Sequence, residues 1–277
     1  AAALAPDGTL YLGVFAEPTI YALRPDGSIK WTTTAGSSGF TAAPAVAADG
    51  TIYFKQNEGA LRAFNPDGTE QWSYTVSGGE GSYGGVAVGA DGTLYYPAND
   101  GAIHAISPTG ERRWIYQPKR EDGTIDGSEI YTSPAIDAQG NLYASTLNGT
   151  VFSVTPSGAE RWLFHTPEAG ENVSSSLALG EGRAYFASYG GFLYALDQTD
   201  GSQIWRSSIE AQARASSPAI AADGSIIVGS YANKLFHFKR DGELIRRWSA
   251  GNWFRSSPVI ADGRAYVGNG DGRVYAF

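Results

Sequence analysis

The chain has 277 residues, a formal net charge of −8, 36 glycines and 13% aromatic residues. The acidic balance argues against a nucleic-acid partner, because affinity for nucleic acid depends on Lys and Arg side chains that neutralise phosphates. The absence of Cys excludes disulfides, thiolate metal sites and a cysteine nucleophile. No run of 18 apolar residues occurs, so we expect no membrane span.

Two residue series recur along the chain with one shared period. The tryptophans are separated by 41, 42, 48, 43 and 43 residues and occur at Trp31, Trp72, Trp114, Trp162, Trp205 and Trp248. The glycines are separated by 42, 42, 48, 42, 42 and 39 residues and occur at Gly8, Gly50, Gly92, Gly140, Gly182, Gly224 and Gly263. Both series contain the same insertion between the third and fourth copies, so they belong to one repeated unit.

Each copy contains short strand patterns joined by tight turns. In the sixth copy, the expected strands are residues 216–221, 225–229, 234–238 and 243–248. Two of the connections are Asp223-Gly224 and Asp241-Gly242, and Asp-Gly between apolar runs is a strong hairpin signal because the turn needs positive φ. Four strands in roughly 42 residues are typical of one β-propeller blade.

We therefore predict an all-β fold, a single seven-bladed β-propeller domain of four-stranded antiparallel blades that spans residues 1–277. In chain order, the copies occupy residues 1–36, 37–78, 79–120, 121–168, 169–211, 212–251 and 252–277. The last copy stops after its third strand, at 273–277, and residues 2–5 align with a first strand. We thus expect a last blade without its fourth strand, and the missing start residue suggests that flanking residues were removed.

The repeat resembles that of the PQQ-like propeller family, which includes quinoprotein alcohol dehydrogenases and the lipoprotein that assists outer-membrane barrel assembly. The resemblance covers the whole chain. It rests on an apolar third strand, a turn with Asp-Gly and a Trp, seen in segments 21–31, 61–72 and 191–205. It implies that each Trp docks between neighbouring blades, beside small residues of the repeat. Ser153 and His237 replace the usual Ala in copies four and six, so we expect those contacts to be less regular.

The resemblance does not extend to the features of the quinone enzymes. Those proteins are about twice as long, are typically eight-bladed, and often carry adjacent cysteines over the cofactor and a calcium ion. This chain has seven copies and no Cys. We therefore expect no cofactor.

The many Asp-Gly pairs recur in register, so we interpret them as turns and not as calcium ligands. The insertion at 117–129 is the exception, because it concentrates four carboxylates in nine residues. Its spacing does not match an EF-hand loop. Asp122, Asp126 and Glu129 are weak candidates for a cation site, and we otherwise expect no metal and no catalytic residue.

Propeller connectivity places both Asp-Gly turns of a blade on one face and the variable loops on the other. The inner ends of those loops differ between copies in a way that the repeat does not require. They are candidate ligand-binding residues, and a packed rim of aromatic side chains is an equally good interpretation: Phe40, Tyr83, Tyr131, Asn172, Arg214, Trp253, Phe254 and Arg255.

Three functional hypotheses remain open. The first is a noncatalytic, extracellular or periplasmic binding module that recognises a protein or carbohydrate partner on the variable face. The second is a polysaccharide lyase or hydrolase with a site at the channel mouth. The third is a sensory or adhesive domain excised from a larger protein. The lack of a recognisable acid/base pair favours binding over catalysis.

Overall fold

The computed structural model of the chain describes residues 2–76, 83–167, 171–213 and 216–277. Over these residues it contains 27 strands and no helix. The strands form seven antiparallel sheets, six with four strands and one with three. Neighbours within each sheet are consecutive in sequence, so each sheet is one blade. The seven-bladed β-propeller is therefore confirmed, including the three-stranded last blade.

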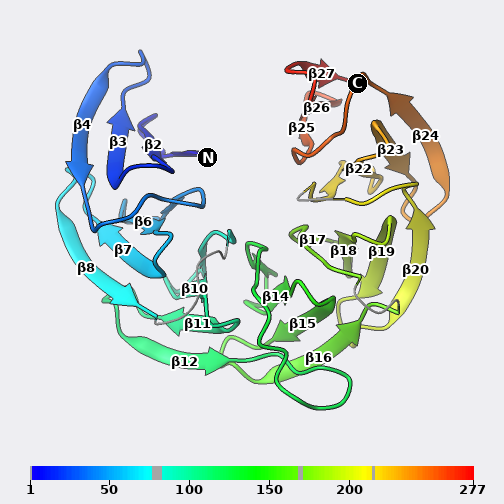
Figure 1. Cartoon of the computed structure of the whole chain (residues 1–277), viewed down its shortest axis with the longest axis horizontal. Coiled ribbons are helices and arrows are strands. Elements are labelled where there is room, and N and C mark those ends of the chain that lie inside the picture. Colours follow the sequence, from blue (N-terminus) through cyan, green and yellow to red (C-terminus); the bar gives the residue numbers. More distant parts are fainter. Residues whose placement is uncertain (1, 77–82, 168–170, 214–215) are drawn as a thin grey trace. The chain divides into compact units, whose positions relative to one another are not determined.

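The first compact unit comprises Ala1–Gln117 and Gly127–Pro134 and contains blades one to three. The fourth strand of each blade lies at its outer edge (Figure 1). The strands are β1 (Ala2–Leu4), β2 (Leu10–Gly13), β3 (Thr19–Leu23) and β4 (Ile29–Thr34), then β5 (Ala45–Val46), β6 (Ile52–Lys55), β7 (Ala60–Phe64) and β8 (Glu70–Thr75), then β9 (Ala87–Val88), β10 (Leu94–Pro97), β11 (Ile103–Ile106) and β12 (Arg112–Tyr116).

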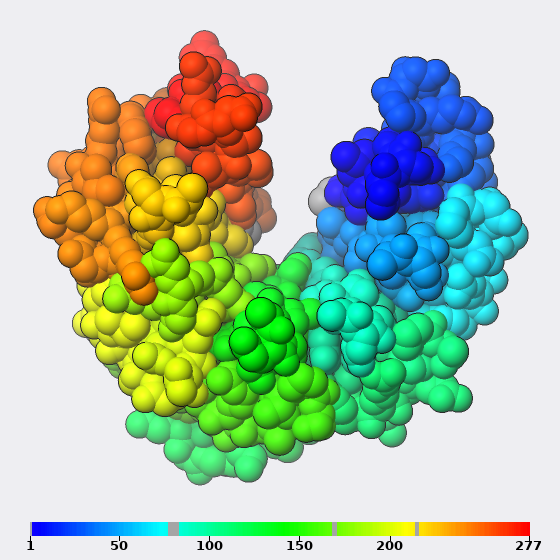
Figure 2. Space-filling view, turned by 180° about the vertical axis from the view of Figure 1, so that it is seen from behind, coloured from blue at the N-terminus to red at the C-terminus, as the bar shows by residue number. Residues whose placement is uncertain are grey.

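The second compact unit comprises Pro118–Asp126 and Ala135–Phe277 and contains blades four to seven. In Figure 2 these blades follow one another from green through yellow and orange to red. The strands are β13 (Ala135–Ile136), β14 (Leu142–Ser145), β15 (Thr150–Val154) and β16 (Glu160–His165), then β17 (Ala178–Gly180), β18 (Arg183–Ala187), β19 (Phe192–Asp197) and β20 (Gln203–Ser208), then β21 (Ala219–Ile220), β22 (Ile226–Ser230), β23 (Lys234–Phe238) and β24 (Leu244–Ser249), then β25 (Val259–Ala261), β26 (Arg264–Gly268) and β27 (Val274–Ala276).

The Asp-Gly pairs form the expected turns. In blade two, Asp49 Oδ1 accepts the Thr51 N–H at 2.9 Å, and Gly50 has a φ of +87°. Asp91 makes the same contact with Thr93, and the hydrogen bonds from the Thr93 hydroxyl and N–H lower the pKa of Asp91 to about 2. A carboxylate that accepts local N–H and hydroxyl groups closes the turn without a metal ion.

Within each unit the core lies between adjacent blades, and tryptophans of the fourth strands close its outer part. Trp72 packs on Tyr53 of its own blade at 5.8 Å between ring centroids. Its Nε1–H donates to Pro108 O of the next blade at 2.8 Å, and a Cβ on Gly110 would meet the indole at 2.7 Å. Trp31, Trp162 and Trp205 make equivalent contacts with the turns of the blades that follow them. These contacts agree with the interblade role expected for the tryptophans.

Blade six departs from this pattern, which corrects the assignment of Trp248 to the regular series. In blade one, Trp31 lies opposite Ala22, whereas in blade six Arg246 lies opposite His237 and Trp248 lies opposite Leu235. The cause is two additional residues between the Gly of the turn and the Trp. Trp248 instead stacks on His237, with ring centroids 6.0 Å apart and planes 13° apart. Blade four is regular despite Ser153, because Trp162 keeps both of its contacts.

Candidate binding site on the loop face

Each blade presents its turns on one side and its variable loops on the other, because its strands are antiparallel and consecutive. We call the side with the turns that follow first and third strands the turn face. The opposite side, with the loops between second and third strands and between blades, is the loop face. The candidate residues belong to loops of the loop face.

Hydroxyl side chains fix the inner ends of the loops in the second unit. Ser175 Oγ accepts the Ala187 N–H at 2.8 Å and donates to Ala187 O at 3.0 Å, so it ties a loop to the end of β18. The Ser176 N–H donates to Ser217 Oγ of the next blade, and the Ser217 N–H donates to Ser257 Oγ, both at 2.9 Å. Sequence reasoning treated these positions only as small residues, and the paired hydroxyls were the missed signal.

Blade three of the first unit lacks this serine, and a lysine replaces it. Gly84 occupies the serine position, while Lys55 of blade two donates from Nζ to Pro97 O at 2.7 Å and to Gly84 O at 3.4 Å. Lys55 is 2% exposed and its Nζ lies 5.2 Å from the centroid of the Tyr96 ring. Burial lowers the pKa of Lys55 to about 7. Sequence reasoning missed this lysine.

Polar residues directly after second strands anchor the loops between blades. Gln56 Nε2 donates to Ala35 O and Ser38 O, both at 2.7 Å. Asn269 Nδ2 donates to Asn252 O at 2.7 Å. The signal for this role is a Gln, Asn, Ser or Thr at the end of a buried strand. The loops are consequently held by side chains of the blade beneath them.

The insertion between copies three and four is held by a buried aspartate. Asp126 is 2% exposed, and its carboxylate accepts hydrogen bonds from Thr146 Oγ1 at 2.6 Å and Asn148 Nδ2 at 2.8 Å. Asp122 instead closes a turn through Thr124, and those hydrogen bonds lower the pKa of Asp122. Glu129 belongs to the other compact unit. Over the described parts of the chain, no three His, Cys, Asp or Glu side chains are grouped to hold a metal ion.

The candidates of the first unit divide into the buried ring of Phe40 and a pair of tyrosines of which Tyr83 is exposed and Tyr131 half-buried. Phe40 is buried in the core between blades one and two, where it packs edge-on to Phe54 at 5.3 Å. Tyr83 is 49% exposed and packs edge-on to Tyr131, with ring centroids 5.1 Å apart. The structure thus brings Tyr83 and Tyr131 together at the surface and assigns Phe40 to the core.

The candidates of the second unit are also separated by burial. Phe254 is 1% exposed and packs in the core between blades six and seven, whereas the adjacent Trp253 is 42% exposed. Arg255 is exposed beside Trp253, and Asn172 accepts the Tyr189 N–H through its backbone carbonyl at 2.8 Å. Arg214 lies outside the described residues.

Trp253 is the central residue of the candidate site. The site is a cavity of about 440 Å³, lined by Trp253, Arg255, Ser256, Gly268, Asn269 and Gly270. Tyr231, from the loop between β22 and β23, supports the indole from the side at 5.5 Å between ring centroids. Sequence reasoning missed Tyr231, although its place on a loop of the same face could have suggested it.

The backbone around Trp253 is fixed by reciprocal hydrogen bonds. The Gly270 N–H donates to Trp253 O at 3.0 Å, and Asn252 Nδ2 donates to Gly270 O at 3.1 Å. The Trp253 N–H donates to Asn252 Oδ1 at 2.9 Å. A Cβ on Gly270 would lie 2.8 Å from Trp253 Nε1, so the position of the indole depends on this glycine. The exposed indole is therefore pre-positioned, which lowers the entropic cost of a contact.

The fold and this arrangement define the class: a repeat β-propeller with a rigid scaffold and variable loops. The chain belongs to the family described as outer membrane protein assembly factor BamB, since the family profile matches residues 2–179, 147–223 and 190–277. This confirms the resemblance to PQQ-like repeat propellers. No curated protein sequence matches the chain significantly.

Solved structures support the fold. BamB from Moraxella catarrhalis aligns over 100% of this chain and 83% of its own length, with a TM-score of 0.84 and 18% identity. A europium-containing methanol dehydrogenase aligns over 100% and 77%, with a TM-score of 0.82 and 15% identity. The C-terminal WD40 domain of Sif2 aligns over 100% and 80%, with a TM-score of 0.81 and 14% identity. At these identities the likeness extends to the fold alone.

Over the described residues, no helix is long and apolar enough to cross a membrane.

Proposed function

We propose that the chain is a noncatalytic binding module that recognises a protein partner through the loop face, in the assembly of outer membrane proteins on the periplasmic side. The family description supports the partner class, because it refers to outer membrane protein assembly. A carbohydrate partner and an extracellular location are the alternatives that the sequence left open.

The observation that carries the proposal is the exposed and fixed side chain of Trp253. An indole that is 42% exposed has an apolar surface that a partner can cover, and Arg255 beside it adds a planar set of donors. Trp, Tyr and Arg are the residue types most enriched at the energetic centres of protein interfaces. In the first unit, Tyr83 and Tyr131 are a second candidate contact of the same chemical type.

The partner can be identified by photocrosslinking in the source cells. A photoreactive residue at Trp253 or Arg255 is expected to crosslink one defined envelope protein, whereas the same residue at Asp67 or Asp241, both in turn-face turns, is expected to crosslink none. Crosslinks of that protein from the turn-face positions alone would contradict the assignment of the binding face. A glycan array and a polysaccharide lyase screen provide the measurements for the carbohydrate and enzyme hypotheses.

Affinity for the purified partner then tests the role of individual side chains. Trp253→Ala and Arg255→Ala are each expected to weaken binding by more than about 1 kcal/mol. Gly270→Ala keeps the Trp253 side chain but displaces its indole, because the added Cβ would lie 2.8 Å from Nε1. It is therefore expected to weaken binding as well. The matched control is Gly272→Ala, whose added Cβ meets no atom within 4 Å but stands at a positive φ. Gly270 itself has no positive φ, so equal effects of the two glycine variants would show that a general disturbance of this loop, and not the indole position, determines affinity.

A further inference from the structure

The contact between Tyr83 and Tyr131 joins two loops of the loop face in the first unit. Their ring centroids lie 5.1 Å apart and their planes are 81° apart, so the edge of one phenol faces the ring of the other. Tyr83 is 49% exposed and Tyr131 is half-buried, so small molecules in solution can reach the pair. Tyr83 lies before β9 and Tyr131 lies after β12, so the contact connects the loop that enters blade three to the loop that leaves it.

The backbone next to the pair holds the two rings in contact. The Gly85 N–H donates to Ser133 Oγ at 2.9 Å. A Cβ on Gly84 would lie 2.3 Å from Thr132 O, so the two chain segments touch without space for a side chain. These contacts lie one and two residues after each tyrosine in the sequence. Both tyrosines therefore extend from one closely packed base, which keeps their rings side by side.

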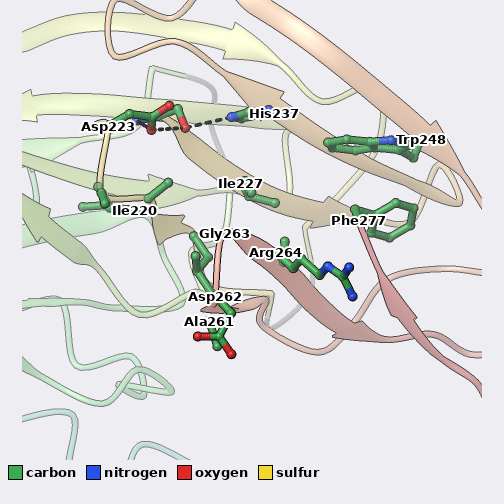
Figure 3. Close-up of a pocket in the computed structure, with 15 residues that line it drawn as sticks. Ile220, Asp223, Ile227, His237, Trp248, Ala261, Asp262, Gly263, Arg264 and Phe277 are labelled. Atoms are coloured by element: carbon green, nitrogen blue, oxygen red, sulfur yellow. Dashed lines mark hydrogen bonds between the residues drawn. The ribbon is translucent and has the colours of Figure 1, made fainter.

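The ring contacts that recur from blade to blade join unlike side chains. In blades one to five, a buried second-strand Tyr packs on a fourth-strand Trp. In blade six, His237 stacks on Trp248 (Figure 3). Tyr83 instead contacts a second tyrosine at the surface. Two phenols in contact are the arrangement that one-electron oxidation can convert to dityrosine.

The composition of the chain directs oxidation to aromatic side chains. Cys and Met, whose sulfur atoms are the usual targets of oxidants, do not occur among the 277 residues, whereas 16 Tyr and 7 Trp do. The second-strand tyrosines of blades one to five are buried, so an oxidant in solution reaches Tyr83 before it reaches them. Exposure and composition thus both favour oxidation at this pair.

We propose that Tyr83 and Tyr131 form an oxidative cross-linking site, at which hydrogen peroxide activated by a haem peroxidase converts the two side chains to dityrosine. Each phenol loses one electron and its hydroxyl proton, and the two tyrosyl radicals form a carbon–carbon bond between their ortho carbons. The hydrogens at those carbons then move to the oxygens and restore both hydroxyl groups. The peroxide takes up the two electrons and two protons and becomes water.

The fixed contact favours coupling within one chain over coupling between chains. Two groups held together react at an effective concentration far above that of a dilute protein. The yield of cross-link per chain is therefore expected to be independent of protein concentration. A covalent bond between residues distant in sequence also restricts the unfolded chain, so the cross-linked protein is expected to have a higher melting temperature.

The test is oxidation of the whole chain, at low protein concentration, with hydrogen peroxide and a haem peroxidase. The expected product is a monomer that has lost the mass of two hydrogen atoms, shows dityrosine fluorescence and yields on proteolysis a cross-linked pair of peptides with Tyr83 and Tyr131. Oxygen added to the exposed Trp253 raises the mass instead, and it reports that the oxidant has acted. Absence of the cross-linked peptides when Trp253 is oxidised would overturn the proposal, as would cross-links between chains alone.

Variants locate the cross-link. Tyr83→Phe and Tyr131→Phe keep an aromatic ring but lack the phenol hydroxyl, so each is expected to abolish both the cross-link and the rise in melting temperature. The matched control is Tyr189→Phe, which removes the hydroxyl of a half-buried tyrosine on a loop of the same face in the second unit. It should leave the cross-link unchanged. A cross-link that persists in Tyr83→Phe, or one that is lost in Tyr189→Phe, would contradict the assignment of the site.

Discussion

Replacing Lys55 with Met tests whether a buried amine stands in for the missing serine of blade three. The folded-state pKa of Lys55 is about 7, below its ordinary value of 10.5. Below pH 7 the amine is protonated in both the folded and unfolded chains. Between pH 7 and 10.5 only the unfolded chain holds the extra proton, so the free energy of unfolding rises with pH through this window. Where the unfolded chain binds one proton more than the folded chain, the free energy of unfolding rises by about 1.4 kcal/mol per pH unit.

The variant removes this titration while it keeps a side chain of similar length. The difference in unfolding free energy between the native chain and Lys55→Met is expected to grow in favour of the native chain by about 2 kcal/mol from pH 7 to pH 9. Urea unfolding of both proteins at matched pH values measures it, and other titrating groups cancel in the difference. At pH 9 the variant also loses the hydrogen bond from Lys55 Nζ to Pro97 O, which contributes about 0.5–1.5 kcal/mol. A difference that is constant between pH 7 and pH 9 would refute the reasoning.

Two further predictions concern the blade interfaces and the cofactor. Trp72→Ala is expected to cost about 3–5 kcal/mol, because it empties the space beside Tyr53 and removes the hydrogen bond to Pro108 O. The control is Arg246→Ala: Arg246 holds the same position in blade six but is exposed, so this variant should lower the melting temperature far less. An equal fall in melting temperature for both variants would count against the docking role of Trp72. Pyrroloquinoline quinone with calcium is expected to neither bind saturably nor support alcohol-dependent dye reduction, and turnover in that assay would show the expectation to be wrong.

The blades could be predicted from the sequence because their signals are local and repeated. An Asp-Gly pair such as Asp49-Gly50 defines its own turn, and seven copies in register define the sheets. Blade six shows where this reasoning fails. The spacing of Trp248 differs little from that of the other tryptophans, but two additional residues after the turn move it to another position in the strand register. Only the pairing of strands shows that Arg246 took its place.

The candidate site was predicted only in part, because burial depends on contacts between distant residues. Trp253 and Phe254 are adjacent aromatic residues, yet one lies at the surface and the other in the core. No local signal separates them, since the orientation of the loop is set by Asn269 and Gly270. Lys55 likewise looks like an ordinary charged residue until its acceptors, Gly84 O and Pro97 O, are known.

The hydrogen bonds from Ser176 to Ser217 and from Ser217 to Ser257 have a consequence for recognition by the second unit. Each joins the root of one loop to the root of the next through a backbone N–H, so the lateral spacing of the loop bases is independent of the residues at their tips. Residues at the loop tips can therefore be substituted during evolution while the loop bases keep a constant separation. A partner that contacts several of these loops therefore needs contact points at a matching distance. It is selected by that distance as well as by the chemistry of the contacts.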